Sequence, residues 1–560
     1  MACSNPRAIM FAAARASLSS TISVGLRIWQ PLRTGWRGFW GVRSKYHMSI
    51  AAAKRSIIEV FIPLKCVIPL RAFMQMIFRY SATISNEIFL SILLRLGRTW
   101  RRATVGRTIL SIRSTLSVDR MLPLAKSRSS RSMAMRLVAS GSTLVLNILL
   151  ARQLGPDYYG QVAFVMAWLL LVVGLMRTGL NNQLTREVAS YDERNERANL
   201  RGIIIRAYQF AVIATIGAGA SIAGAAIVLD SRLSPGQSRL FLIGLPLLLF
   251  LSLMSTTEAI TKGFGKTVSG QLGEFFVRPI SHLLFVVLLW LPIGFDLNRQ
   301  SAVGAFVLSG LCGFAVAWMV RPRGPLQALR QAEPQFHDRQ WLRDSVAISA
   351  VGWLSIVNVQ ATPILVGVIG GDAEVAHYQI ASQFAFLASL MVVILNTLQA
   401  PTMSRAHAIG DVVRLQRMAS HACEISVVFA FGSAIFFALF GELIATTLLG
   451  KSYNGVETVL FVILIGTSIN ALTGSVGILL IACRLENTMY LALGLALATN
   501  ISGCILLVPK YGAIGGAWSA TASLACWNGC MLLRLYRATG VLSLPLVTRL
   551  LPSSRPQPLP

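Results

Sequence analysis

The feature that most constrains this chain is a series of long apolar runs between residues 135 and 533. A helix rises 1.5 Å per residue, so about 20 residues cross the ~30 Å hydrocarbon core of a membrane. The predicted spans are residues 135–153, 161–181, 203–229, 239–258, 269–293, 301–320, 345–370, 376–398, 422–449, 457–482, 488–508 and 513–533. In lipid the backbone must satisfy its own hydrogen bonds, and long apolar runs do this as helices. We therefore predict an all-α polytopic membrane protein of about twelve transmembrane helices.

Composition and charge agree with this prediction and argue against a nucleic-acid partner. Hydrophobic residues make up 54% of the chain and charged residues only 13%, whereas about a quarter of the residues of soluble proteins are charged. The formal net charge is +29, and residues 1–136 hold 23 Lys and Arg against three acids. The other basic residues lie between apolar runs, which is typical of membrane-protein loops rather than of a groove that follows phosphates. The eight cysteines are scattered without a C-x-x-C pair, so no metal site or cofactor is expected.

The basic residues also predict the orientation of the helices. Loops that follow even-numbered spans carry fifteen Lys and Arg, and loops that follow odd-numbered spans carry six. Because positive loops stay in the cytoplasm, we expect the even loops and both termini to be cytoplasmic.

Residues 1–130 form a basic extension without a clear span, because Lys65, Arg71 and Arg95 interrupt its apolar patches. Three interpretations fit: a disordered or interfacial segment attracted to anionic lipid, a targeting peptide of unusual length, or a mis-assigned start. We favour a start at Met121 or Met133, because the recognisable pattern begins near Arg131.

A weak internal repeat divides the spans into two sets of six. Gln161 aligns with Gln379 and Asn181 with Gln399, an offset of 218 residues. An offset of six helices preserves orientation, so we expect two parallel six-helix bundles facing a central cavity. The predicted boundaries are 131–320 and 344–537 for the bundles, 321–343 for a cytoplasmic linker and 538–560 for a short tail.

Three motifs resemble one known family. Residues 149–161 read LLARQLGPDYYGQ, residues 179–189 read GLNNQLTREVA and residues 508–520 read VPKYGAIGGAWSA. In this order they resemble polysaccharide biosynthesis proteins, the Wzx-type O-antigen and exopolysaccharide flippases of the multidrug/oligosaccharidyl-lipid/polysaccharide exporter superfamily. The resemblance covers roughly residues 131–535.

This resemblance implies a V-shaped pair of helix bundles in a bacterial inner membrane. It implies a substrate, an undecaprenyl-diphosphate-linked oligosaccharide, that crosses by alternating access while its prenyl tail stays in lipid. It also implies membrane lipids, a polysaccharide polymerase and glycosyltransferases as partners. Such a substrate needs cationic groups for the diphosphate and Asn, Gln and aromatic groups for the sugars.

Ionisable side chains inside spans are costly and are therefore candidate functional residues. Glu274, Arg278 and His282 recur every four residues, which places them on one face of the fifth helix and lets Glu274 neutralise Arg278. The functional hypothesis is that Arg278 attracts the diphosphate. The alternative is an ion pair near the membrane surface, with the arginine reaching toward headgroups. Arg177 is a weaker candidate, for which the same alternative is favoured.

Polar uncharged residues complete the candidate set. Asn147 and Asn358 occupy comparable places in the first and seventh helices, and Gln360 lies beside Asn358. These residues and Gln383 in the eighth helix could contact a glycan, or they could make interhelical hydrogen bonds.

Other functions share parts of this pattern. A cation-coupled multidrug exporter has the same architecture but usually needs a deep acid, which the central portions of helices one and seven lack. A lipid II flippase commonly has additional helices. A membrane-embedded glycosyltransferase needs a large polar loop with catalytic acids, and a pump driven by nucleotide needs a Walker loop. We therefore interpret the chain as a transporter and not as an enzyme.

Overall fold

The computed structural model describes residues 128–291, 296–483, 485 and 487–545, and all its regular secondary structure is helical. The long and short α-helices are α7 (Arg128–Glu193), α8 (Arg197–Val228), α9 (Gln237–Gly263), α10 (Thr267–Leu272), α11 (Arg278–Trp290), α12 (Arg299–Val320), α13 (Arg323–Ala328), α14 (Asp338–Gly370), α15 (Asp372–Ala408), α16 (Val412–Leu448), α17 (Val456–Thr473), α18 (Val476–Ala482) and α19 (Asn487–Thr539). Single turns of tighter helix cover Asp230–Arg232, Leu329–Gln331 and Lys451–Tyr453. The predicted extension 1–130 and the tail 538–560 lie largely outside the described residues.

The all-α membrane architecture predicted from the apolar runs is confirmed. Within the described residues, nine helices are long and apolar enough to cross a membrane. Two of these contain two predicted spans each, because α7 bends at Gly155 (φ 72°) and α19 bends at Gly512 (φ 51°). Glycine has no Cβ, so it enters this left-handed region without the clash that other residues meet. The count of twelve membrane crossings stays a prediction.

The tenth predicted span differs from the structure. Residues 457–482 are not one helix, because α17 ends at Thr473 and α18 begins at Val476. Gly474 separates them with φ 61° and ψ −129°, and a Cβ on it would lie 3.2 Å from the Cβ of Cys423 in α16. The close approach of α16 and the left-handed backbone both require glycine here.

The fifth predicted span is helical but irregular. Residues Gly273–Val277 form a π-helical turn between α10 and α11. Pro279 has no N–H to donate to the carbonyl four residues earlier, which favours a local change of hydrogen-bond pattern. On the other side, Gly273 packs so closely on α12 that a Cβ would lie 2.6 Å from the Gly313 carbonyl oxygen. Turns of this kind occur often at functional sites.

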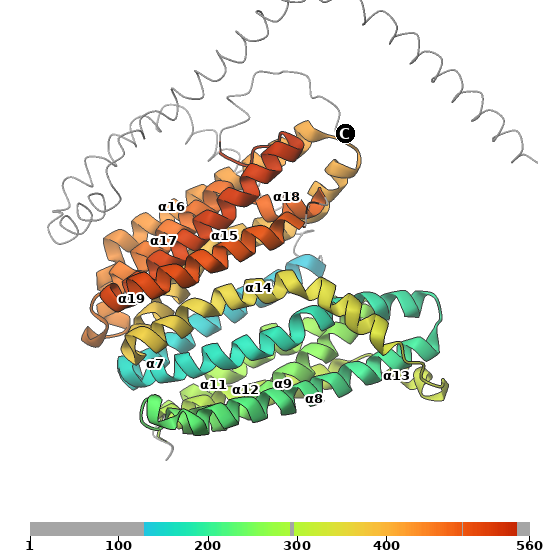
Figure 1. Cartoon of the computed structure of the whole chain (residues 1–560), viewed down its shortest axis with the longest axis horizontal. Coiled ribbons are helices and arrows are strands. Elements are labelled where there is room, and N and C mark those ends of the chain that lie inside the picture. Colours follow the sequence, from blue (N-terminus) through green and yellow to red (C-terminus); the bar gives the residue numbers. More distant parts are fainter. Residues whose placement is uncertain (1–127, 292–295, 484, 486, 546–560) are drawn as a thin grey trace, which may run out of the picture. The chain divides into compact units, whose positions relative to one another are not determined.

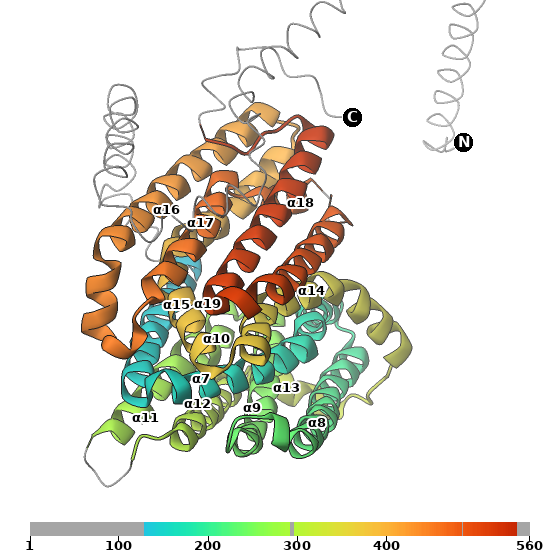
Figure 2. The ribbon, with the colours of Figure 1, turned by 60° about the vertical axis from the view of Figure 1, so that its left-hand side comes forward.

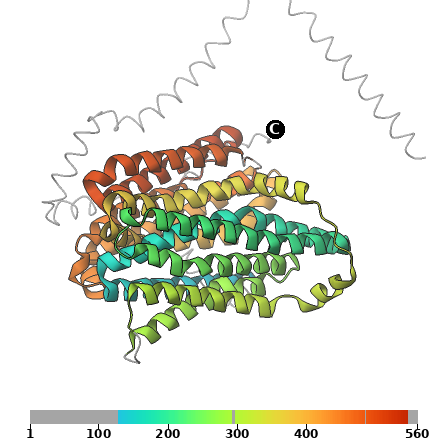
Figure 3. The ribbon, with the colours of Figure 1, turned by 60° about the horizontal axis from the view of Figure 1, so that its bottom comes forward.

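The described helices pack as two groups (Figure 1). Helices α8 to α12 pack with α7 in one group, and α15 to α19 pack with one another in the second. Figure 2 shows the second group above the first, and Figure 3 shows the antiparallel helices α8 to α12 lying side by side. Helix α14 contacts both α7 and α19, and α15 also packs on α7, so these two helices join the two groups. The predicted domain boundaries themselves stay predictions.

The two groups touch closely at the end of the helices that contains Gly155, which we call the Gly155 end. Ser234 Oγ donates a 2.6 Å hydrogen bond to Asp372 at the start of α15, and Tyr453 donates to the Ala151 carbonyl at 3.1 Å. A Cβ on Gly160 would collide with the backbone carbonyl of Asp372. Gly160 belongs to the first sequence motif, so the structure explains this glycine by backbone contact between the two groups.

The opposite end of the helices carries the segment between α12 and α14, and we call it the linker end. There the first turns of α14 pack on the first group, and Ser345 donates a hydrogen bond to Gln183 of α7. Trp353, further along α14, donates to the Leu175 carbonyl at 2.7 Å. The second half of α14 instead bonds to α19, where Thr362 Oγ1 lies 3.1 Å from Asn500 Oδ1. The side-chain hydrogen bonds of α14 thus run to α7 from its first half and to α19 from its second half, although Gly367 near its end also packs against Phe164 of α7.

Candidate functional site

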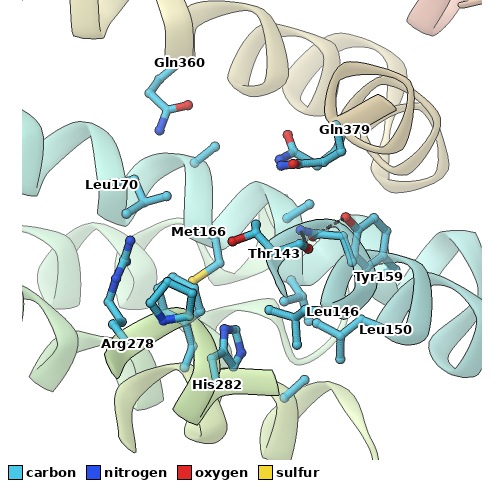
Figure 4. A pocket seen from close by; sticks show the side chains of 18 residues that line it. Thr143, Leu146, Leu150, Tyr159, Met166, Leu170, Arg278, His282, Gln360 and Gln379 are labelled. Carbon is cyan, nitrogen blue, oxygen red and sulfur yellow. Dashed lines mark hydrogen bonds between the residues drawn. The ribbon is translucent and has the colours of Figure 1, made fainter. Parts of the chain in front are cut away.

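A cavity of about 190 Å³ lies between the two helix groups (Figure 4). Helices α7, α11 and α12 line it from the first group, and α14 and α15 line it from the other side. Of the predicted site residues, five line the cavity: Asn147, Arg278, His282, Gln360 and Gln383. Residues far apart in the sequence therefore meet at one place, as the central-cavity prediction requires.

Arg278 and His282 form the basic side of the cavity and lie one helical turn apart on α11. Figure 4 shows both side chains on the same wall, with Gln360 and Gln379 across the space. The His282 side chain is only 5% exposed, and its Nε2 has no hydrogen-bond partner in the structure. The buried Arg278 Nε also lacks one. Such unpaired polar atoms are costly inside a protein, so they indicate a place where a ligand or water binds.

Phe306 of α12, which also lines the cavity, packs against Arg278 and His282. Its ring centroid lies 5.7 Å from the Arg278 guanidinium carbon and 4.6 Å from the His282 ring centroid, edge to face. A guanidinium over an aromatic face gains attraction without using any of its N–H donors. The arginine is therefore oriented while its donors stay available.

Elsewhere in the cavity, amide and hydroxyl groups lie among apolar side chains such as Leu146 and Met166. Gln360 comes from α14, and Gln379 and Gln383 lie one turn apart on α15. Tyr159 donates a 2.8 Å hydrogen bond to Asn147 Oδ1, and the Asn147 amide donates to the Thr143 carbonyl. Asn147 is thus partly occupied by its own helix, whereas the glutamine amides can both donate and accept. This combination suits a ligand with many hydroxyl groups.

The predicted pairing of Glu274 with Arg278 is wrong as a direct ion pair. Glu274 instead accepts a 2.8 Å bond from Arg177 of α7, and its side chain is 12% exposed. Arg177 reaches the carboxylate from the neighbouring helix, and charge-assisted hydrogen bonds of this kind are the strong ones. Glu274 still attracts Arg278 electrostatically. Neither Glu274 nor Arg177 lines the cavity, so both act behind it.

A second buried ion pair extends this charged cluster away from the cavity. Glu258 of α9 binds Lys262 one turn later and lies close enough to Glu274 to interact with it. In this cluster two neighbouring carboxylates, Glu258 and Glu274, lie between Lys262 on one side and the arginines on the other, with Arg278 at the cavity end.

Asn358 does not line the cavity either. Its Oδ1 accepts hydrogen bonds from Asn500 at 3.1 Å and from Ser523 at 3.2 Å, both in α19. The interhelical hydrogen bond that the sequence left open as an alternative is therefore the observed role.

Among the cavity residues that were not predicted from the sequence are Tyr159, Phe306 and Gln379. Tyr159 and Gln379 were visible as parts of the first motif and of the internal repeat. The two glutamines that the repeat aligns behave differently. Gln161 accepts a 2.5 Å hydrogen bond from Arg299, whereas Gln379 lines the cavity. Phe306 had no signal beyond being an aromatic residue in an apolar run.

Comparison with protein families identifies the chain. The model of the family described as "Polysaccharide biosynthesis protein" matches residues 129–407, which include the first two sequence motifs and every residue of the cavity. The chain belongs to this family. The resemblance predicted from the motifs is thereby confirmed. No sequence match was found among curated proteins.

Solved structures share the fold at low sequence identity. An inward-facing multidrug resistance MATE family transporter of the MOP superfamily has a TM-score of 0.63 at 12% identity, covering 74% of this chain and 96% of its own. The lipid II flippase MurJ in an inward closed conformation has a TM-score of 0.59 at 15% identity, covering 72% and 87%. An outward-facing MATE family transporter has a TM-score of 0.52 at 13% identity, covering 74% and 96%. These likenesses confirm the multi-pass transporter fold.

Proposed function

We propose that this polysaccharide biosynthesis family member is a flippase for an undecaprenyl-diphosphate-linked oligosaccharide. It acts in a bacterial inner membrane, with both termini in the cytoplasm, and supplies a surface polysaccharide such as O-antigen, exopolysaccharide or capsule. The observation that carries the proposal is the cavity between the helix groups. It presents Arg278 and His282 with unpaired nitrogens, and none of the residues that line it is an acid.

The charge of the cavity favours an anionic substrate. A diphosphate cannot enter hydrocarbon without losing its hydration, which costs many kcal/mol for a bare ion. A guanidinium offers several N–H donors in a fixed fork that matches phosphate oxygens. Arg278 can thus replace water around the diphosphate, and Glu274 behind it limits the cost of burying the cation when the cavity is empty.

The amides of the cavity favour a glycan. Sugar hydroxyls donate and accept hydrogen bonds, as do Gln360, Gln379 and Gln383. The prenyl tail has lipid available to it on the sides of the protein, where long apolar helices are exposed. The headgroup therefore crosses through the cavity while the tail stays in the membrane.

The arrangement of the helix groups supports alternating access. Contacts such as Ser234 to Asp372 close the Gly155 end, which we assign to the periplasmic side from the distribution of basic loops. Release of the substrate requires these contacts to break and the linker end to close, as in transporters built from repeated bundles.

Complementation tests this proposal. We expect the chain to restore surface polysaccharide in a bacterium that lacks its own O-antigen flippase, and the Arg278→Ala variant to fail at equal membrane levels. Arg534→Ala serves as the matched control, because Arg534 is an exposed arginine of α19 away from the cavity. A chain that restores no polysaccharide but lowers the accumulation of a cationic drug would contradict the proposal.

A further inference from the structure

A second cavity, of about 400 Å³, lies at the linker end and takes no part in the proposed transport path. It is a groove between the last turns of α7, the first half of α8 and the first half of α14. Most of its lining side chains are apolar, among them Leu180, Ile203 and Val346. We call it the linker-end groove.

The linker-end groove opens on the lipid-facing side of the helices. Ile213 of α8 is 68% exposed and Phe210 of the same helix is 43% exposed, and both line it. In a multi-pass membrane protein these exposed apolar side chains face lipid. The α8 wall runs from Ile203 to Ile213, about 15 Å of helix, and one acyl chain covers half of the ~30 Å hydrocarbon core. The groove therefore has the length and polarity to hold one hydrocarbon chain.

An ion pair stands at the surface end of the groove. Arg206 Nε donates to Asp338 at 2.9 Å, and the two side chains are 43% and 56% exposed. Arg206 also donates to Gln209, and its guanidinium stacks over the Phe336 ring at 4.3 Å. A fixed cation beside a fixed anion complements a headgroup that carries both charges, a phosphate and an ammonium.

A buried amide provides a second, independent observation. Gln183 lines the groove, is only 1% exposed, and its Nε2 has no hydrogen-bond partner in the structure. Its Oε1 already accepts from Ser345. An unpaired amide donor in an apolar wall requires an acceptor, and a phospholipid has ester carbonyls between its headgroup and its chains.

We propose that the linker-end groove binds one phospholipid with an amine-bearing zwitterionic headgroup, of the phosphatidylethanolamine type. Its phosphate binds Arg206, its ammonium binds Asp338, an ester carbonyl accepts from Gln183, and one acyl chain lies along the apolar wall. A prenyl chain is a poorer occupant, because its hydrocarbon has no acceptor for Gln183 and its diphosphate belongs at Arg278. The bound lipid ties α8 to α14, one of the helices that join the two groups.

Native mass spectrometry of the full chain tests the proposal. We expect one tightly retained phosphatidylethanolamine per protein, and about tenfold weaker retention of phosphatidylglycerol, which has no ammonium for Asp338. Arg206→Gln with Asp338→Asn should weaken retention of phosphatidylethanolamine about tenfold, and Gln183→Leu severalfold. Arg186→Gln, another exposed arginine at the linker end, is the matched control and should change nothing. Equal retention in all variants would overturn the proposal.

Photo-crosslinking tests the site without disturbing it. A photoreactive phenylalanine analogue replaces Phe210, which lines the groove, or Phe436, which is lipid-exposed on α16. We expect a phosphatidylethanolamine adduct at position 210 in clear excess over position 436. Equal adducts at both positions, or an adduct of added undecaprenyl diphosphate that displaces phosphatidylethanolamine at position 210, would overturn the proposal. The second outcome would leave the proposed transport function standing.

Discussion

At the residue scale, the cavity depends on how the protein carries a cation inside the membrane. Arg278 is stabilised by the Glu274 carboxylate outside the cavity and by the ring of Phe306 in the cavity wall. Neither contact uses its Nε, which has no hydrogen-bond partner. The arginine is thus held in place by its neighbours and keeps donor capacity for an anion, which is what a binding residue needs.

The first prediction concerns Arg278 directly. Arg278→Gln should lower the affinity for undecaprenyl diphosphate roughly 10–100-fold, because a hydrogen bond to a charged group contributes about 1.5–3 kcal/mol. The affinity of Arg278→Lys should lie between those of the wild type and Arg278→Gln, because lysine keeps the positive charge but lacks the forked set of N–H donors. Binding of a fluorescent polyprenyl diphosphate to the purified protein measures this. An unchanged affinity in Arg278→Gln, with Arg534→Gln as control, would exclude the arginine from the site.

The second prediction concerns the ion pair behind the cavity. Glu274→Gln leaves Arg177 without its carboxylate in a place where only a third of its side chain is exposed. We expect a loss of about 1–3 kcal/mol in stability, seen as a lower unfolding temperature in detergent. The double variant Glu274→Gln with Arg177→Gln should recover part of the loss, because the charge of Arg177 is removed together with its carboxylate, and only Arg278 still lacks the carboxylate nearby. A double variant that is less stable than Glu274→Gln alone would show that the unpaired charge of Arg177 does not cause the loss.

Single-sequence reasoning found five residues of the cavity, which are Asn147, Arg278, His282, Gln360 and Gln383. It could not tell Asn147 from Asn358, which occupy comparable positions, because their roles depend on neighbours from other helices. Asn358 faces Asn500 and Ser523, and these partners are more than 140 residues away in the chain. The partner of Glu274 was missed for the same reason, since Arg177 is 97 residues distant.

At the element scale, glycines decide where helices bend and where they touch. Gly155, Gly371 and Gly512 all have positive φ, and each lies where one membrane-length helix follows another. The breaks at these three glycines were visible in the sequence, because each glycine lies between two predicted spans. The break at Gly474 was not, because an isolated glycine in an apolar run is compatible with a continuous helix.

The third prediction uses the glycine that touches the second helix group. Gly160→Val places a side chain against the Asp372 backbone, where a Cβ already collides. Overpacking of this kind costs about 1–3 kcal/mol, so the closed Gly155 end should become roughly tenfold less populated. Surface polysaccharide in the complementation assay should fall accordingly. Gly217→Val in α8 is the control, because no atom lies within 4 Å of its Cβ position. Equal activity of both variants would contradict a gating contact at Gly160.

At the scale of the whole described unit, the proposed transport requires the two helix groups to separate at the Gly155 end. The apolar runs predicted the membrane architecture because length and hydropathy alone decide whether a helix spans. They could not show which ends of the groups are in contact. These contacts depend on single hydrogen bonds, such as Ser234 to Asp372 between the groups and those of α14 to α7 and to α19.

The fourth prediction concerns a crosslink that would lock the Gly155 end. Ser234→Cys with Asp372→Cys, in a chain whose native cysteines are replaced, should form a disulfide because the two wild-type side chains are 2.6 Å apart. The oxidised protein should lose transport and regain it on reduction, since alternating access needs both ends to open in turn. Each single cysteine variant is the control. Full transport by the quantitatively crosslinked protein would show that this end does not open.

The most direct test of the central claim is translocation in proteoliposomes of defined composition. The purified chain is reconstituted with a fluorescent undecaprenyl-diphosphate-linked oligosaccharide, and a membrane-impermeant quencher reports the fraction moved between leaflets. We predict time-dependent translocation by the wild type and by Arg534→Ala, and a rate at the level of protein-free liposomes for Arg278→Ala. Translocation that is equal with and without Arg278, or transport of a cationic dye in place of the lipid-linked glycan, would contradict the account.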